Sequence, residues 1–271
     1  MDKTEYYGKI DVLIVIWEVL RMYKNYIFDL YGTLIDIRTD ESSLNFWRKA
    51  VSVFARAKAS YTPGELNHAY KKYVRRELWK ERLSHPMWHH RDIELLHVFA
   101  RLYTNKGITP DRELLLDTAD RFRAASTLKL ELYDGVIDLL DALKAHGKKI
   151  YLLSNAQESF TMPELEQTGL LKYFDGIMIS SQARVCKPEK RFFDALLTKY
   201  GLDPTECLMI GNDKNTDMQG AKNAGIDGLY IHQEISAPVE SEDEICAKWK
   251  IMDGDVRKIK DLALKVPEGF V

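Results

Sequence analysis

The chain has 271 residues, of which 45% are hydrophobic and 30% are charged, and its formal net charge is −2. This composition is typical of globular proteins, and the matched charges exclude an extended basic surface for nucleic acid. The length allows one large domain or two smaller ones. The three cysteines, Cys186, Cys207 and Cys246, are scattered, which favours reduced thiols in a cytoplasmic protein over a disulfide framework.

The segment 1–23 does not match the rest of the chain. Its apolar stretch at 10–20 is broken by Asp11 and Glu18, is too short to span a membrane, and lacks the small-residue cleavage site of a signal peptide. Two interpretations stay open. The segment is a non-native extension, with Met22 as the natural start, or it is an added helix or edge strand. We therefore expect no membrane partner.

The first clear element is a short apolar run at 26–28, followed by an acid and a glycine turn. Continuous hydrophobicity predicts a strand that is buried on both faces. Asp29 then lies at the carboxyl end of this strand, where open α/β sheets bind their ligands. Gly32 allows a sharp turn beside a bound group, and Thr33 offers a hydroxyl to an anion. The alternative is a strand with an ordinary polar turn.

Long amphipathic helices follow from about residue 39 to residue 128, with no convincing strand between them. Apolar residues recur at helical spacing in four runs. The runs cover 44–54, 66–79, 93–103 and 110–125. We interpret this block, 38–129, as a helical cap domain inserted into a core made of 24–37 and 130–271.

The remainder of the chain alternates between strands and helices. The predicted strands are 149–153, 177–180, 207–210, 228–231 and 250–252. The predicted helices are 135–146, 162–168, 188–200 and 216–224, with a last helix near the end. Such alternation predicts an α/β fold with a doubly wound, parallel, Rossmann-like sheet.

In a parallel sheet the carboxyl ends of the strands share one edge, so four loops should converge there. They carry Asp29 and Thr33, then Ser154 and Asn155, then Lys187, and finally Asp213 and Asp217. Three carboxylates repel one another unless a divalent cation neutralises them, and oxygen ligands suit Mg²⁺. Ser154, Asn155 and Lys187 would then bind phosphoryl oxygens while Asp29 attacks phosphorus.

Four motifs carry a resemblance to a known family. They are FDLYGTL at 28–34, LLSN at 152–155, Lys187-Pro188, and IGNDKNTDMQGAKNAG at 210–225. Their order and spacing resemble the haloacid dehalogenase-like (HAD) superfamily of hydrolases over 25–36 and 130–260, with a helical C1-type cap between. We expect Asp29, Asp213, Asp217 and the backbone carbonyl of Tyr31 to bind one Mg²⁺.

One residue departs from the pattern of the phosphatases in this family, which usually carry an aspartate two residues after the nucleophile. Here that residue is Tyr31. A phenol with a pKa of about 10 can donate a proton to a leaving group but is a poor base. The first motif thus resembles the L-2-haloacid dehalogenases, which need no metal, whereas the fourth resembles the magnesium-dependent phosphatases.

The resemblance implies a hydrolase, most simply a magnesium-dependent phosphatase of a small phosphorylated metabolite that forms an aspartyl-phosphate on Asp29. Two alternatives stay open: dehalogenation of 2-haloacids by Asp29 without metal, and an anion-binding module with little turnover. Arg38 lies where the first motif enters the cap, so we expect it to help to select the substrate. Cap helices have no readable code for the substrate, and the oligomeric state stays open.

Overall fold

The computed structural model describes residues 23–264. The interpretations of segment 1–22 lie outside the described residues. Tyr23, the last residue of the predicted extension, is buried against the sheet and its phenol donates a hydrogen bond to Asp227. At this residue, therefore, the chain already belongs to the core.

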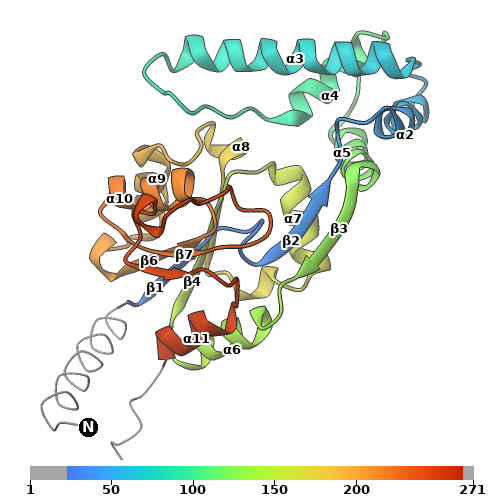
Figure 1. Cartoon of the computed structure of the whole chain (residues 1–271). Coiled ribbons are helices and arrows are strands. Elements are labelled where there is room, and N and C mark those ends of the chain that lie inside the picture. Colours follow the sequence, from blue (N-terminus) through green and yellow to red (C-terminus); the bar gives the residue numbers. More distant parts are fainter. Residues whose placement is uncertain (1–22, 265–271) are drawn as a thin grey trace, which may run out of the picture.

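A six-stranded parallel sheet forms the centre of the larger unit, in the order β5-β4-β1-β6-β7-β8 (Figure 1). Its strands are β1 (Asn25–Phe28), β4 (Lys149–Ser154), β5 (Gly176–Ile179), β6 (Cys207–Gly211), β7 (Asp227–Ile231) and β8 (Trp249–Ile251). The predicted α/β fold with a parallel sheet is confirmed. β1 pairs with β4 on one side and β6 on the other, so its end lies in the middle of the sheet edge.

Helices cover both faces of this sheet, as a doubly wound fold requires. They are α6 (Val136–Ala145), α7 (Glu158–Gln167), α8 (Ser180–Ala183), α9 (Lys190–Tyr200), α10 (Gln219–Ala224) and α11 (Arg257–Leu264). Phe28 packs in the cluster that includes α6 and α11, whereas Ile27 packs in the cluster of α9 and α10. Burial on both faces explains why the β1 run is continuously apolar.

The inserted block contains four helices: α2 (Leu44–Ala55), α3 (Pro63–Ser84), α4 (Leu95–Thr104) and α5 (Arg112–Ser126). They share a hydrophobic cluster of their own and lie to one side of the sheet (Figure 1). Two antiparallel strands, β2 (Ile35–Thr39) and β3 (Thr127–Leu132), connect them to the core. The domain limits of 38 and 129 stay a prediction.

Strand β3 was not predicted, because the sequence interpretation treated the whole region up to 128 as helical. The segment TLKLEL alternates apolar and polar residues, which is the strand period, but it is short and follows a helix without a break. Pairing with β2 supplies the hydrogen bonds that make it a strand. Pairing with a distant strand, and not the local sequence alone, therefore makes residues 127–132 a strand.

The cap touches the core at a second place, through the loop between α3 and α4. The Asp92 N–H donates to the Arg184 carbonyl at 3.0 Å, and the Cys186 N–H donates to the His90 carbonyl at 3.0 Å. This contact lies immediately before Lys187 in the chain. The cap is therefore fastened next to a residue of the predicted site.

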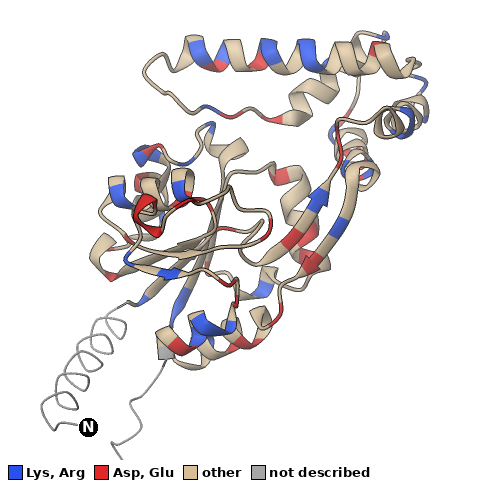
Figure 2. Ribbon diagram, viewed as in Figure 1, with Lys and Arg blue, Asp and Glu red and all other residues tan. Residues whose placement is uncertain are grey.

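Charges of both signs are interspersed over the cap and the core (Figure 2). This distribution agrees with the near-zero net charge of the sequence. Within residues 23–264, every helix is too short or too polar to cross a membrane.

Candidate active site

The carboxyl end of β1 presents Asp29 at the centre of the sheet edge. Its N–H donates to the Ile210 carbonyl of β6 at 2.9 Å, and 8% of the residue is exposed. Gly32 follows with a φ of +81°, and a Cβ on it would lie 2.4 Å from the Asn212 side chain. Only glycine therefore fits this turn. The turn brings the first motif against the fourth.

Lys187 lies between two acids of the predicted site. Its Nζ is 2.6 Å from Asp29 Oδ1 and 2.6 Å from Asp217 Oδ1, and only 2% of the residue is exposed. Burial on its own lowers the pKa of this ammonium, but the carboxylates of Asp217 and Asp29 outweigh burial and raise it. Burial also raises the pKa of Asp217, to about 7, although Lys187 opposes this.

Asn155 fixes the backbone of Lys187 rather than leaving its amide free. Its Oδ1 accepts the Lys187 N–H at 2.8 Å, and its Nδ2 donates to the Lys187 carbonyl at 3.1 Å. The sequence interpretation gave this side chain to phosphoryl oxygens. In the structure both of its polar atoms bind the backbone of Lys187, and its contact with phosphoryl oxygens stays a prediction.

Two hydroxyls lie in the loops that carry the acids. The Ser154 hydroxyl is buried and has no hydrogen-bond partner among residues 23–264. Buried hydroxyls are rarely left unpaired, so this donor suits a bound anion. Thr33 is fully buried, and its hydroxyl donates to Asn212 Oδ1 at 3.4 Å, a long contact that leaves it able to turn to another acceptor.

The two acids of the fourth motif, Asp213 and Asp217, accept hydrogen bonds from backbone N–H groups of their own loop. Asp213 Oδ1 accepts from the N–H groups of Asn215 and Thr216 at 2.7 and 3.1 Å, at the start of the π-helical turn η3 (Lys214–Met218). Asp217 Oδ2 accepts the Asp213 N–H at 3.0 Å. As placed in residues 23–264, no three His, Cys, Asp or Glu side chains form a metal-binding cluster.

The donor set nevertheless fits a hard divalent cation. Asp29, Asp213 and Asp217 bring three carboxyl groups to the single ammonium of Lys187. Lys187 binds one oxygen of Asp29, and the turn binds one oxygen of Asp213. The remaining carboxylate oxygens can serve Mg²⁺, which needs only one or two protein carboxylates and completes its shell with water and phosphate.

Tyr31 lies at the junction of cap and core, two residues after Asp29. Its phenol donates to Glu164 Oε2 and is 3.2 Å from Thr161 Oγ1, both on α7. Arg123 of α5 binds the same glutamate, with 2.6 Å between Nε and Oε1. Burial first, and then the Glu164 carboxylate, raise the pKa of Tyr31 above its ordinary value. The phenol therefore keeps its proton at neutral pH.

The family model of haloacid dehalogenase-like hydrolases matches residues 23–225. The chain belongs to this family. The match spans the four converging loops and the inserted helices between the first and the second loop, so the resemblance noted in the sequence is confirmed.

Several known proteins resemble this hydrolase. Pyrimidine 5'-nucleotidase PynA of Streptococcus pneumoniae is 28% identical over 85% of this chain and 94% of that protein. Phosphoglycolate phosphatase of Agrobacterium fabrum is 28% identical over 76% of this chain and 78% of that protein. The structure of 2-haloacid dehalogenase from Pseudomonas syringae pv. Tomato superposes with a TM-score of 0.60 at 15% identity, covering 89% and 97%. That structural likeness shows the fold alone.

Arg38 donates to Glu234, in the loop after β7, at 2.7 Å, and 55% of its side chain is exposed. Its part in selecting the substrate stays a prediction. Glu164 and Arg123 were not singled out, although they hold Tyr31. A glutamate inside a helix and an arginine near a helix end give no signal in the sequence until the tertiary fold brings them together.

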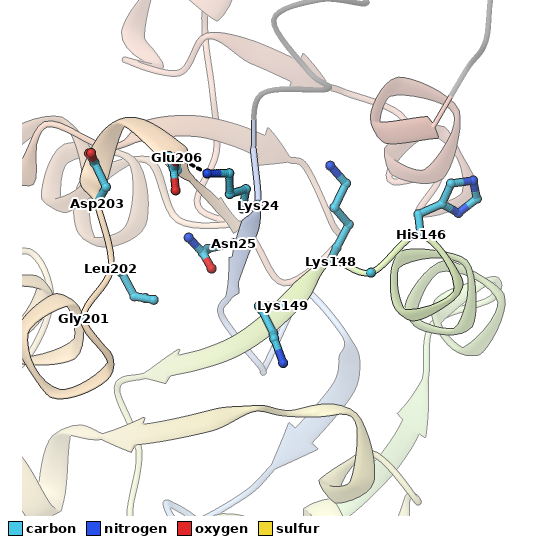
Figure 3. Close-up of a pocket in the computed structure, with 10 residues that line it drawn as sticks. Lys24, Asn25, His146, Lys148, Lys149, Gly201, Leu202, Asp203 and Glu206 are labelled. Carbon is cyan, nitrogen blue, oxygen red and sulfur yellow. Dashed lines mark hydrogen bonds and ion pairs between the residues drawn. The ribbon is translucent and has the colours of Figure 1, made fainter.

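A hollow of about 480 Å³ lies at the amino end of β1 and β4, the opposite edge of the sheet from Asp29 (Figure 3). Its lining includes Lys24 and Lys149, which already form ion pairs with Glu206 and Asp175. It is therefore separate from the converging loops, and these two lysines are already matched by acids.

Proposed function

We propose that this hydrolase is a magnesium-dependent phosphatase of a small phosphorylated metabolite, and that its intermediate is an aspartyl-phosphate on Asp29. The observation that carries the proposal is the buried ammonium of Lys187 bound to Asp29; at the end of the neighbouring strand β4, the Ser154 hydroxyl has no hydrogen-bond partner among residues 23–264. A nucleophilic carboxylate, a fixed cation and a free donor are what a transferring phosphoryl group needs. The phosphatase names of the relatives support the same conclusion.

The chemistry follows from where the side chains lie. One Asp29 oxygen attacks phosphorus, and the alcohol leaves with its electron pair. Lys187 and Ser154, with Thr33 turning from Asn212, bind the phosphoryl oxygens as charge builds up. Mg²⁺ held by Asp29, Asp213 and the Tyr31 carbonyl would offset phosphoryl charge. Asp217, bonded to Lys187 and to the Asp213 backbone, keeps both residues in place.

Tyr31 makes the two halves of the reaction unequal. Its phenol is bonded to Glu164 and keeps its proton, so it can assist departure of the alcohol. Hydrolysis of the aspartyl-phosphate needs a base to take a proton from water, and a phenol does this badly. We propose that the second half limits turnover. A good leaving group then gives a burst of product before a slow steady state.

Dehalogenation of 2-haloacids is the second candidate. The L-2-haloacid dehalogenases, which the first motif resembles, also carry a tyrosine two residues after the nucleophilic aspartate. Halide leaves without a proton, so that chemistry has no need of a second aspartate. Asp213 favours phosphate chemistry, because it resembles a metal-site acid of the magnesium-dependent branch and adds a carboxylate that metal-free dehalogenation does not need.

The test is the metal dependence of p-nitrophenyl phosphate hydrolysis, run beside chloride release from 2-chloropropionate. Activity on the phosphate should vanish with chelator and return with Mg²⁺, and Asp213→Asn should weaken metal affinity and activity together. Asp203→Asn is the matched control, because Asp203 also accepts a backbone N–H at the start of a turn but lies outside the site. Full phosphatase activity in chelator, or chloride release alone, would refute the proposal.

A further inference from the structure

We infer that Asp92, in the cap, is a positioning residue of the active site: it holds in place the two core loops that carry Ser154 and Lys187. This inference rests on the proposed phosphatase function and names a cap residue on which the geometry of that site depends. The carboxylate of Asp92 bonds to Ser180, to Gln157 and to its own backbone neighbour, so it would act through other residues.

The loop between α3 and α4 runs beside the segment that leads from α8 to Lys187 (Figure 1). Arg91 and Val185 pair there as an antiparallel bridge. One backbone hydrogen bond of this pairing joins the Cys186 N–H to the His90 carbonyl at 3.0 Å, and Cys186 is the residue before Lys187. The backbone of the cap is therefore linked to the core one residue away from the buried lysine.

The carboxylate of Asp92 reaches a second core loop through Ser180, the first residue of α8. Its Oδ2 accepts the Ser180 hydroxyl proton at 2.6 Å, and the Ser180 oxygen accepts the Ala156 N–H at 2.8 Å. Ser180 is fully buried, so solvent does not replace a partner that is lost. One hydroxyl thus joins Asp92 to the loop after β4, which carries Ser154 and Asn155.

Gln157 ties the loop after β4 to the cap a second time. Its Oε1 accepts the Leu95 N–H at 2.9 Å, and its Nε2 donates to the Ile93 carbonyl at 2.9 Å and to Asp92 Oδ1 at 3.4 Å. Asp92 Oδ1 also accepts the Ile93 N–H at 2.8 Å. Both oxygens of Asp92 therefore act as acceptors, which a carboxylate provides and the single oxygen of an amide does not.

The groups held in this way adjoin the proposed chemistry. Ser154 and Asn155 directly precede Ala156, and Asn155 binds the Lys187 N–H and carbonyl at 2.8 and 3.1 Å. A shift of the loop 154–157 would therefore move the Ser154 hydroxyl and Lys187 together. A displacement of about 1 Å can cost roughly 10²-fold in rate. The way the cap is fastened at Asp92 thus sets the position of two groups that would bind phosphoryl oxygens.

Hydrogen exchange of the full-length protein, read by mass spectrometry, tests this positioning without any substrate. Asp92→Asn and Ser180→Ala should each speed exchange in peptides that contain 154–157 and 184–187, because both remove a bond that ties these segments together. Glu94→Gln is the matched control. Glu94 is also a half-buried acid of the same cap loop and accepts a backbone N–H, that of Leu96 at 3.3 Å, but this bond stays inside the cap. Exchange in its peptides should match the parent.

The same variants are compared in hydrolysis of p-nitrophenyl phosphate with Mg²⁺. Asp92→Asn should lower kcat by about tenfold to a hundredfold and change KM much less, since misplaced Lys187 and Ser154 chiefly lose contacts with charge that builds up in the transition state. Ser180→Ala should give a similar loss. Because both residues act through one chain of hydrogen bonds, the double variant should lose no more than the larger single loss.

Unchanged exchange at 154–157 and 184–187 in both variants would overturn the inference. Faster exchange with an unchanged kcat would also overturn it, as would a lower melting temperature with neither change, because Asp92 would then only fasten the cap. If the parent neither hydrolyses p-nitrophenyl phosphate nor carries phosphate on Asp29, the proposed function fails, and the exchange result decides by itself whether Asp92 holds the two loops.

Discussion

Two groups of charged side chains meet at the first motif, and each holds a cation against acidic side chains. In the core group, Lys187 lies between Asp29 and Asp217. In the cap-side group, Arg123 forms an ion pair with Glu164. The core cation is nearly inaccessible, with 1% of its side chain exposed against 15% for Arg123.

The difference lies in what supports each group. The core group stands on loops that leave adjacent parallel strands, and Asn155 bonds to the backbone of its lysine on both sides. The cap-side group joins a cap helix, α5, to a core helix, α7. The first arrangement is suited to chemistry that needs fixed atoms. The second depends on how the cap sits on the core.

The largest effect should come from removing the proposed nucleophile. Asp29→Asn keeps the shape of the side chain, and Lys187 retains Asp217 as a partner, so the fold should persist. We expect kcat/KM for p-nitrophenyl phosphate to fall by at least ~10³-fold, as for enzymes that lose a nucleophile. Asp36→Asn on β2, which removes an ion pair with Lys129, is the control. Substantial remaining activity would assign the nucleophile elsewhere.

Substitution of the two cations should show directly that the two groups contribute unequally to hydrolysis. Lys187→Met should cost at least ~2 kcal/mol of transition-state stabilisation, because a charge-assisted contact to the phosphoryl group is lost in a closed site. Arg123→Met should reduce hydrolysis of the same aryl phosphate less. Both are measured as kcat/KM, with thermal melting to monitor folding. Equal losses of kcat/KM in the two variants would show that Lys187 is no more important for hydrolysis than Arg123.

An effect in the opposite direction is expected at Tyr31, where the two groups adjoin. Tyr31→Asp introduces a carboxylate at the position of the missing base, and general base help is typically worth ~10²–10⁴-fold. Even a partly misplaced carboxylate should therefore speed the steady state visibly. Tyr31→Phe keeps the ring without the hydroxyl and should show no such gain. A slower Tyr31→Asp enzyme without a burst would instead give the ring a role in shaping the pocket.

The core group could be predicted because its residues sit at fixed offsets from recognisable strands. Asp29 follows an apolar run, and Lys187 and Asp217 belong to motifs whose loops must converge in a parallel sheet. Contacts between elements could not be predicted in this way. Nothing in the sequence says that Asn155 bonds to the Lys187 backbone or that Glu164 receives the Tyr31 phenol, because both depend on packing between separate loops and helices.

The most direct test of the central claim is a rapid-quench reaction of the parent enzyme with an activated aryl phosphate and Mg²⁺, followed by mass analysis. We expect one phosphoryl group to accumulate on Asp29 before the steady state, and none to appear on the Asp29→Asn enzyme. A steady state reached with no phosphorylated enzyme would contradict it. So would labelling of Asp29 by 2-chloropropionate, without metal, in place of phosphate.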